Sequence, residues 1–175
     1  QRFKVEIHSQ NLDTIWQLEQ KLLPSLIEMR MRGIRVDVDK AVQLEREFVH
    51  REKDLLKQIK KLSGVEVDIW AARQIGHAFD KLGIDYPKTP KSGEPSFKQS
   101  WLTNSPHDIS KLIVQAREIN KFHGTFINSI LKYEHKGRIH GEIKQLKSEQ
   151  GGTVSGRLAM SNPNLQQLPA RSKEF

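Results

Sequence analysis

The strongest pattern along this chain is a recurrence of apolar residues every three or four positions, which is typical of amphipathic helices. It extends over residues 12–31, 38–63, 71–81 and 105–133. Pro24 falls inside the first stretch, where it lacks an amide donor and crowds the preceding turn, so we expect a break or kink there. The pattern predicts a mainly helical protein.

Small and polar residues mark the ends of the predicted helices. A glycine follows each of the first three stretches, which is a common way for a helix to end. Ser96 and Gln99 have the spacing of a capping box, which predicts a brief helix there. Ser105 and Pro106 fit the N-cap and first position of the last long helix.

Two segments depart from the helical period. Residues 85–96 hold three prolines and a glycine, which favours a loop or projecting tip. In residues 138–144 apolar and polar residues alternate, which is typical of a β-strand, and we expect residues 153–158 to pair with them in an antiparallel ribbon. The predicted fold class is mainly α with a small antiparallel β-ribbon, in which two long antiparallel helices flank a basic tip.

Composition narrows the function classes. The 175 residues include 29 Lys and Arg against 21 Asp and Glu, a net charge of +8. A basic balance favours polyanions, although many soluble proteins are mildly basic without binding them. There is no Cys, which excludes disulfides and thiolate metal sites. With no long apolar run and no signal-peptide pattern, we expect an intracellular protein without membrane contact.

The residues show no complete catalytic constellation. Asp37 and Asp39 have a spacing that can hold a divalent metal, but no further acidic ligand lies nearby in sequence, so helix capping is favoured. Ser155 has no partner that suggests an acyl-transfer nucleophile. The chain alone is therefore predicted to hold no metal and to carry no catalytic residue.

Lysines and small hydroxyl residues gather in the predicted tip, at Lys88, Lys91, Ser92 and Ser96. Small residues let backbone amides approach a phosphate, and lysines supply the charge. A plain solvated turn explains the same composition equally well.

Residues 152–171 combine long polar side chains with Gly and Pro and contain no acid. Arg157 can donate two hydrogen bonds to minor-groove acceptors, and Asn164, Gln166 and Gln167 can do likewise. Minor-groove acceptors lie in similar places for all base pairs, so such contacts test shape and tolerate sequence. The alternative is an ordinary capped loop packed on a sheet.

This stretch resembles family A DNA polymerases, the group of bacterial DNA polymerase I and its phage and organellar relatives. The family pattern is approximately Thr-x-Thr-Gly-Arg-Leu-Ser-Ser-x-x-Pro-Asn-Leu-Gln-Asn-Ile-Pro-x-Arg. It is matched at Thr153, Ser155, Gly156, Arg157, Leu158, Pro163, Asn164, Leu165, Gln166, Pro169 and Arg171. Further segments resemble the family in the expected order, at 29–37, 73–83, 88–96, 117–121 and 137–140.

The resemblance implies a division into subdomains. Residues 1–21 would be the remnant of a preceding exonuclease-like domain or a linker. Residues 22–135 would form a helical thumb with its tip at 85–98, and residues 136–175 the first strands of a palm.

The resemblance also implies contacts with template-primer DNA. The residues expected at the primer terminus, in the minor groove, are Arg157, Asn164, Gln166, Gln167 and Arg171. Those expected to hold backbone phosphates are Lys88, Lys91, Ser92, Ser96, Arg117 and Lys121. Thr153 and Ser155 are expected to support the hairpin itself.

Two departures from the family matter. The family often has Asn-x-Asn/Asp-Ser where this chain has residues 68–71, Asp-Ile-Trp-Ala, so no DNA contact is carried over there. The link at 145–152 is longer than in the bacterial proteins and more similar to phage enzymes.

The family's metal-binding Asp, its fingers helix and its His-Asp-Glu turn would follow Phe175. Polymerisation needs two carboxylate-held divalent ions. The resemblance therefore implies a fragment of a DNA-directed DNA polymerase, a nucleotidyltransferase whose parent uses Mg²⁺, while the fragment alone binds no cofactor and is inactive. We expect a cytoplasmic monomer, in a bacterium or phage-infected cell, that contacts template-primer DNA and the rest of the polymerase chain. The alternatives are a free-standing nucleic-acid-binding module and a helical-hairpin interaction protein.

Overall fold

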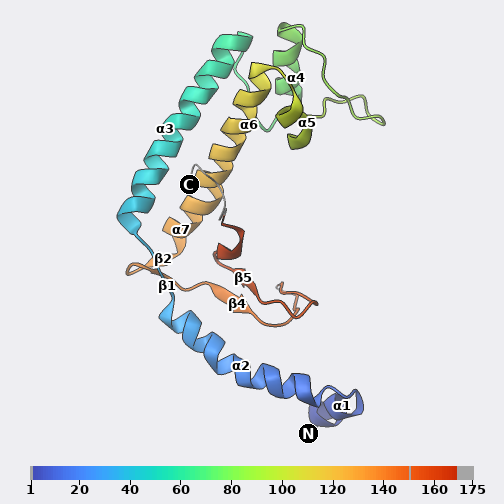
Figure 1. The fold of residues 1–175 in the computed structure, drawn as a ribbon, viewed down its shortest axis with the longest axis vertical. Coiled ribbons are helices and arrows are strands. Elements are labelled where there is room, and N and C mark those ends of the chain that lie inside the picture. Colours follow the sequence, from blue (N-terminus) through green and yellow to red (C-terminus); the bar gives the residue numbers. More distant parts are fainter. Residues whose placement is uncertain (1, 150, 169–175) are drawn as a thin grey trace. The chain divides into compact units, whose positions relative to one another are not determined.

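The chain folds into two compact units (Figure 1). The structure is a computed structural model that describes residues 2–149 and 151–168. Unit 2 is the contiguous segment 39–128, and unit 1 combines the flanking segments, 1–38 and 129–175. The subdomain limits proposed from the resemblance stay a prediction.

Most of the described chain is helical, which confirms the predicted fold class. The helices are α1 (Arg2–Ser9), α2 (Asp13–Arg32), α3 (Val38–Ser63), α4 (Ala72–Lys81), α5 (Gln99–Asn104), α6 (Asp108–Lys121) and α7 (Asn128–Tyr133), with a π-helix over Phe122–Ile127 and a 3-10 helix over Leu165–Gln167. The strands are β1 (Ile34–Arg35), β2 (Glu134–His135), β3 (Arg138–Ile139), β4 (Glu142–Lys144) and β5 (Ala159–Ser161). Within the described ranges, none of the helices has the length and apolar character that a membrane crossing requires.

In unit 2, the long helices α3 and α6 lie side by side and run antiparallel (Figure 1). Their facing sides bury apolar residues, and α4 and α5 close the far end of the core. Each such side chain contributes about 1.5–3 kcal/mol by leaving water. The largest fully buried apolar residues of this unit are Phe48, Ile59, Ile75, Phe79, Leu102, Ile109, Ile113 and Ile119.

The predicted helix over 105–133 contains a change of helix type. The π-helix joins α6 to α7, and its backbone hydrogen bonds span five residues where those of an α-helix span four. At its start the Phe122 ring lies 5.1 Å from the Phe48 ring on α3. Beside it, His123 Nε2 lies 2.5 Å from the Glu52 carboxylate. These contacts with α3 hold the wider turn, and apolar spacing along the sequence does not reveal it.

Two predicted helix starts are wrong. Pro24 lies inside α2 and does not end the helix, so the predicted break is absent, while the predicted kink stays a prediction. Ser96 does not cap a helix, because α5 begins at Gln99 and the Ser96 amide instead donates to the Pro87 carbonyl at 2.9 Å. The Ser-Pro start of the last helix is also wrong.

The last long helix begins at Asp108, after an extended residue at His107. Ser105 is the C-cap residue of α5, and its buried Oγ accepts a hydrogen bond from Ser110 Oγ at 2.8 Å. The hydroxyl predicted to cap a helix therefore satisfies a polar group inside the core.

In unit 1 the strands form two small antiparallel sheets. β3 lies between β1 and β2, with Ile139 opposite both Ile34 and Glu134. β4 pairs with β5, so that Ile143 lies opposite Met160. The predicted strand over 138–144 is therefore split between two sheets. The predicted partner over 153–158 is wrong, because residues 159–161 pair with β4 instead.

Side chains from β3 and the residue after it satisfy the end of α2. The last carbonyls of a helix have no partner within the helix. Arg138 Nη1 donates to the Arg32 and Gly33 carbonyls, each at 3.1 Å. His140 Nδ1 donates to the Arg30 carbonyl at 2.8 Å. The sheet and α2 are thereby joined within unit 1.

Most side chains of α2 are exposed to solvent. Leu26 is the only buried residue of α2. Trp16, Ile27 and Met31 are 43%, 50% and 76% exposed. The apolar stripe that the sequence places on this helix is therefore mostly on the surface of the described chain.

Gly33 generates a prediction about unit 1. It has a positive φ of 65°, and an added Cβ would lie 2.7 Å from His140 Cε1 and 2.9 Å from the Ile139 carbonyl oxygen. We expect Gly33→Ala to lower the free energy of unfolding by about 3 kcal/mol, through backbone strain and displacement of the His140 ring. Urea denaturation measures this.

Gly137→Ala is the matched control. Gly137 has a φ of 76° in the same unit, but an added Cβ meets nothing within 4 Å. We expect a cost of only about 1 kcal/mol there. Equal costs for both variants would show that the close approach of His140 to Gly33 contributes nothing.

Candidate nucleic-acid interface

The predicted tip is an ordered hairpin in unit 2. Lys88 and Pro95 form an antiparallel bridge. The Thr89 amide donates to the Glu94 carbonyl and the Gly93 amide to the Thr89 carbonyl, both at 2.8 Å. These bonds fix the turn at residues 90–92. We call residues 86–96 the tip hairpin.

A cluster of aromatic rings packs against the start of the tip hairpin and the residues that follow it. The Phe79 ring of α4 lies 6.1 Å from Tyr86 and 5.0 Å from Phe97, measured between centroids. Trp101 lies 5.9 Å from both Phe79 and Phe97. Aromatic pairs at these separations and tilted angles attract beyond their area burial.

Glycine at position 76 of α4 permits a close approach of the hairpin to the helix. An added Cβ there would lie 3.1 Å from both Pro95 Cγ and the Tyr86 hydroxyl oxygen. That hydroxyl donates to Asp80 Oδ2 at 3.3 Å. Burial, and then the bond to Asp80, raise the pKa of Tyr86, so its hydroxyl remains a donor at neutral pH.

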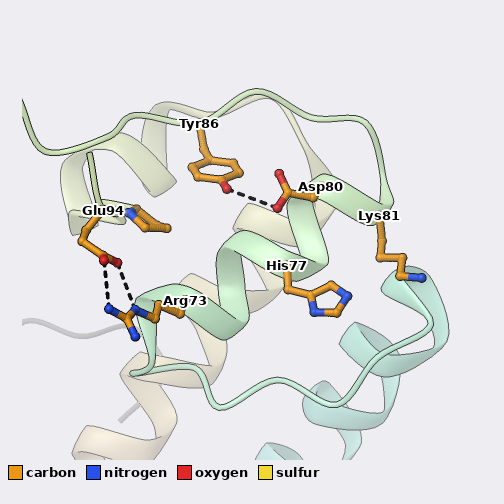
Figure 2. Close-up of a pocket in the computed structure, with 7 residues that line it drawn as sticks. Arg73, His77, Asp80, Lys81, Tyr86 and Glu94 are labelled. Carbon is orange, nitrogen blue, oxygen red and sulfur yellow. Dashed lines mark hydrogen bonds and ion pairs between the residues drawn. The ribbon is translucent and has the colours of Figure 1, made fainter. Parts of the chain in front are cut away.

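An ion pair ties the hairpin to the first turn of α4, as Figure 2 shows. Arg73 Nε and Nη2 donate to the two oxygens of Glu94, at 3.0 and 2.8 Å. The hydrogen bonds from Arg73, and then its charge, hold the pKa of Glu94 below its ordinary value of 4.5. Between these elements lies an open pocket of about 600 Å³, whose lining also includes His77 and Lys81.

The predicted phosphate ligands of the tip hairpin are presented to solvent. Lys91 and Ser92 lie exposed at the turn. Lys88 is also exposed, and its Nζ lies 5.7 Å from the centre of the Tyr86 ring. Ser96 is only partly exposed, and Lys121 lies exposed at the end of α6.

Arg117, another predicted phosphate ligand, is bonded within the protein. Its Nε donates to the Ile69 carbonyl at 2.7 Å and its Nη1 to the Phe97 carbonyl at 3.0 Å. The guanidinium carbon lies 5.1 Å from the centre of the Trp70 ring. Burial lowers the pKa of Arg117 below its ordinary value, and at neutral pH the group remains a cation. Its predicted contact with phosphate stays a prediction.

In unit 1, residues 152–158 form a loop before β5. Thr153 Oγ1 donates to the Arg157 carbonyl at 2.6 Å, and Ser155 Oγ donates to Thr153 Oγ1 at 3.4 Å. These bonds confirm that the two hydroxyls support the loop. Gly152 has a φ of 96°, and an added Cβ would lie 2.2 Å from the Leu146 carbonyl oxygen, so the loop requires glycine there.

Two of the five predicted minor-groove residues, Asn164 and Gln166, are engaged inside unit 1. Gln166 Oε1 accepts a hydrogen bond from the Met160 amide at 3.0 Å, and its Nε2 donates to the Leu158 carbonyl at 3.1 Å. Asn164 Oδ1 accepts from the Gln166 amide at 3.1 Å and caps the 3-10 helix. Both side chains brace the backbone on either side of β5.

Two others are presented to solvent. Arg157 and Gln167 are exposed, and their side-chain nitrogens form no hydrogen bond with any residue that the structure describes. Arg171, the last predicted member of this group, lies outside the described residues. The loop therefore presents Arg157 as a cation whose own carbonyl is already used to fix the turn.

The described residues do not fit a metal centre. In the ranges 2–149 and 151–168, no group of three or more His, Asp or Glu side chains is placed to hold an ion. Asp39 lies in the first turn of α3.

Sequence reasoning missed two contributors to the interface. The Arg73–Glu94 pair was not predicted, because its members are 21 positions apart and lie on different elements. The contacts of Trp70 were also not predicted; the available signal is that the family pattern often has Asn or Asp at this position, where this chain has a large ring.

The Arg73–Glu94 pair generates a prediction. We expect Arg73→Glu to raise the hydrogen-exchange rate of the Thr89 and Gly93 amides roughly two- to fivefold, because both amides lie in the hairpin that the pair holds. Restoring opposite charges with Glu94→Arg in the same protein should slow the exchange again. Lys81→Glu, on the exposed side of α4, is the matched control.

The same exchange should depend on pH. The lowered pKa of Glu94 means that its contribution is present above pH 4.5 and is lost as the pH falls through that lowered value. Exchange rates, corrected for intrinsic pH dependence, should therefore rise toward those of Arg73→Glu in acid. Rates unaffected by the single reversal would show that the pair does not hold the hairpin.

Comparisons with known proteins bear on this arrangement. The sequence profile described as DNA polymerase family A matches residues 38–175. The DNA-directed DNA polymerase of Pseudomonas phage M6 is 34% identical over 178 residues, which cover 96% of this chain and 27% of the phage protein. DNA polymerase I of Geobacillus stearothermophilus is 31% identical over 90% of this chain and 18% of its own length.

The fold is also similar to a solved structure, the POL domain of Pol1 from M. smegmatis in complex with DNA primer-template and dNTP. The TM-score is 0.73 and the identity 25%, over 89% of this chain and 27% of that one. The chain thus spans less than a third of the length of these relatives.

Proposed function

Because this chain belongs to DNA polymerase family A, we propose that it binds template-primer DNA on behalf of a DNA-directed DNA polymerase. In this proposal the tip hairpin and Lys121 hold backbone phosphates, and residues 152–168 contact the primer terminus in the minor groove. Support comes from relatives that are named DNA polymerases and from a similar structure described with DNA primer-template.

The observation that best supports the proposal is that Arg157 is exposed on a loop held by hydrogen bonds. Its guanidinium is exposed, while the loop beneath it is fixed by Thr153 and the neighbouring strand by Gln166. A hydrogen-bonded loop that presents the two donors of an exposed guanidinium suits the acceptors of the minor groove, because these lie in similar places for every base pair. Gln167 provides a further exposed amide beside the same strand.

The engaged side chains have a different part in this proposal. Gln166 and Asn164 use their amide groups on the backbone, so they orient the segment that presents Arg157 and Gln167. A contact of Arg171 with the primer terminus remains part of the proposal, which rests there on the family resemblance alone.

For the whole polymerase we propose nucleotidyl transfer with Mg²⁺ in the cytoplasm of a bacterium or a phage-infected cell. Divalent ions would polarise the reacting oxygens. The described residues do not fit such a site, so their proposed part is to bind and orient the duplex. The rest of the polymerase chain would be the other partner.

The first test is the salt dependence of binding. A protein that neutralises phosphates releases counterions, so log Kobs falls linearly with log salt concentration. We expect Lys91→Ala to weaken binding to a recessed primer-template about three- to tenfold and to reduce the slope by about 1. Fluorescence anisotropy at several salt concentrations measures both.

Lys61→Ala, an exposed lysine on α3 of the same unit, should change neither quantity. If the folded wild-type protein binds no DNA at low salt, the proposal fails and the helical-hairpin interaction protein becomes the better interpretation.

The second test concerns the primer terminus. We expect Arg157→Ala to weaken binding to a recessed primer-template about tenfold while leaving binding to a blunt duplex within about twofold, because the lost contact lies at the primer end. Competition between the two DNAs measures the ratio. Lys147→Ala, an exposed cation of the same unit, is the control. Equal losses on both DNAs would contradict a contact at the terminus.

A further inference from the structure

Trp70 is held by specific contacts at its backbone and at its ring. The residue is 55% exposed. Its amide donates to Asp68 Oδ1 at 2.8 Å, and its indole Nε1 donates to Asn120 Oδ1 at 3.0 Å. The guanidinium carbon of Arg117 lies 5.1 Å from the centre of its ring. An exposed tryptophan held at both its backbone and its ring nitrogen presents a fixed face to that cation.

Arg117 in turn joins both ends of one continuous segment. Its two donors meet the carbonyls of Ile69 and Phe97. Residues 70–96, which include α4 and the tip hairpin, lie between those carbonyls along the chain. One guanidinium on α6 therefore holds both the start and the finish of the segment that carries the tip lysines.

The ring nitrogen of Trp70 is linked to α3 through Asn120. Asn120, which accepts the indole hydrogen bond, donates through Nδ2 to Glu52 Oε1 at 2.9 Å. The second oxygen of Glu52 lies 2.5 Å from His123 Nε2, and these two side chains are only 15% and 12% exposed. The position of Trp70 is thus fixed by both long helices of unit 2.

We propose that Arg117 is a positioning residue, held by Trp70, which sets the tip hairpin for DNA and does not itself bind phosphate. The proposal rests on the proposed function only in that the tip hairpin contacts DNA. It replaces the phosphate contact that the family resemblance implies for this residue.

The chemistry of the contacts favours this role. A guanidinium that moved to a phosphate would leave two backbone carbonyls without their donor, and buried acceptors without a partner are costly. It would also leave the indole face. Lysine cannot replace it, because an ammonium lacks the planar fork that meets two carbonyls at once and stacks on a ring.

The first experiment is made without DNA. Hydrogen exchange of residues 72–97 is compared with that of α3 in the wild type, Arg117→Lys, Trp70→Phe and Trp70→Ala. We expect Arg117→Lys and Trp70→Ala to speed exchange in residues 72–97 at least fivefold while α3 remains protected. Trp70→Phe retains the ring face, so it should have the smallest effect. Arg46→Lys, the same substitution at an exposed position of α3, is the matched control.

The second experiment is a double-mutant cycle in DNA binding. A positioning residue acts through the tip lysines, so the three- to tenfold effect of Lys91→Ala should shrink to less than twofold in the Arg117→Lys background. An independent phosphate ligand would leave the Lys91→Ala effect unchanged. A loss of overall stability would also leave it unchanged as long as both proteins are folded.

The outcomes separate the two proposals. Wild-type exchange in Arg117→Lys, together with additive effects in the cycle, would overturn the positioning role and restore a phosphate contact. Faster exchange with non-additive binding supports it. If the wild type binds no DNA, the proposed function fails, and the exchange experiment still decides whether Arg117 and Trp70 hold the segment.

Discussion

Backbone carbonyls at the ends of elements are satisfied in this protein by long side chains from distant parts of the chain, and the local architecture depends on that constraint. Arg138 and His140 meet the carbonyls that end α2, and Arg117 meets those that flank α4 and the tip hairpin. Gln166 donates to the Leu158 carbonyl, eight positions away, just before β5. An unpaired carbonyl out of contact with water costs about 1–3 kcal/mol, and the part-buried carbonyls of Gly33, Ile69 and Phe97 avoid that cost through these donors.

The need to satisfy polar groups through contacts outside their own element also explains which features the sequence could predict and which it could not. The long helices follow from apolar spacing, because burial on one face requires that period whatever the partner is. Two helix starts did not follow. The helix expected after Ser96 begins at Gln99, and the Ser96 amide donates to the Pro87 carbonyl. The Ser105 hydroxyl, expected to cap the last long helix, accepts a hydrogen bond from Ser110 inside the core, so another group takes the oxygen that a cap would use. The π-helix was missed for a related reason, since contacts with Phe48 and Glu52 hold it.

The candidate interface also contains features that the sequence could predict and others that it could not. Composition alone indicated exposed cations, and Lys88, Lys91 and Arg157 are exposed in the structure. Arg117 is also a cation, and Gln166 is an amide like the exposed Gln167, yet both use their donors within the protein. Their partners could not be inferred without the fold. Net charge therefore overstates the number of cations available to DNA, and the distribution of internal bonds determines which ones remain.

The different chain continuity of the two units has a consequence for synthesis on the ribosome. Unit 2 is a single segment, so all of its residues are available to one another once position 128 has left the exit tunnel. Unit 1 must wait, because Gly33 meets Arg138 across 105 positions of chain. Domains tend to fold as units during translation. The nascent chain would therefore complete its helical unit first, while α2, with its exposed apolar surface, remains without the sheet that ends it and is open to chaperones.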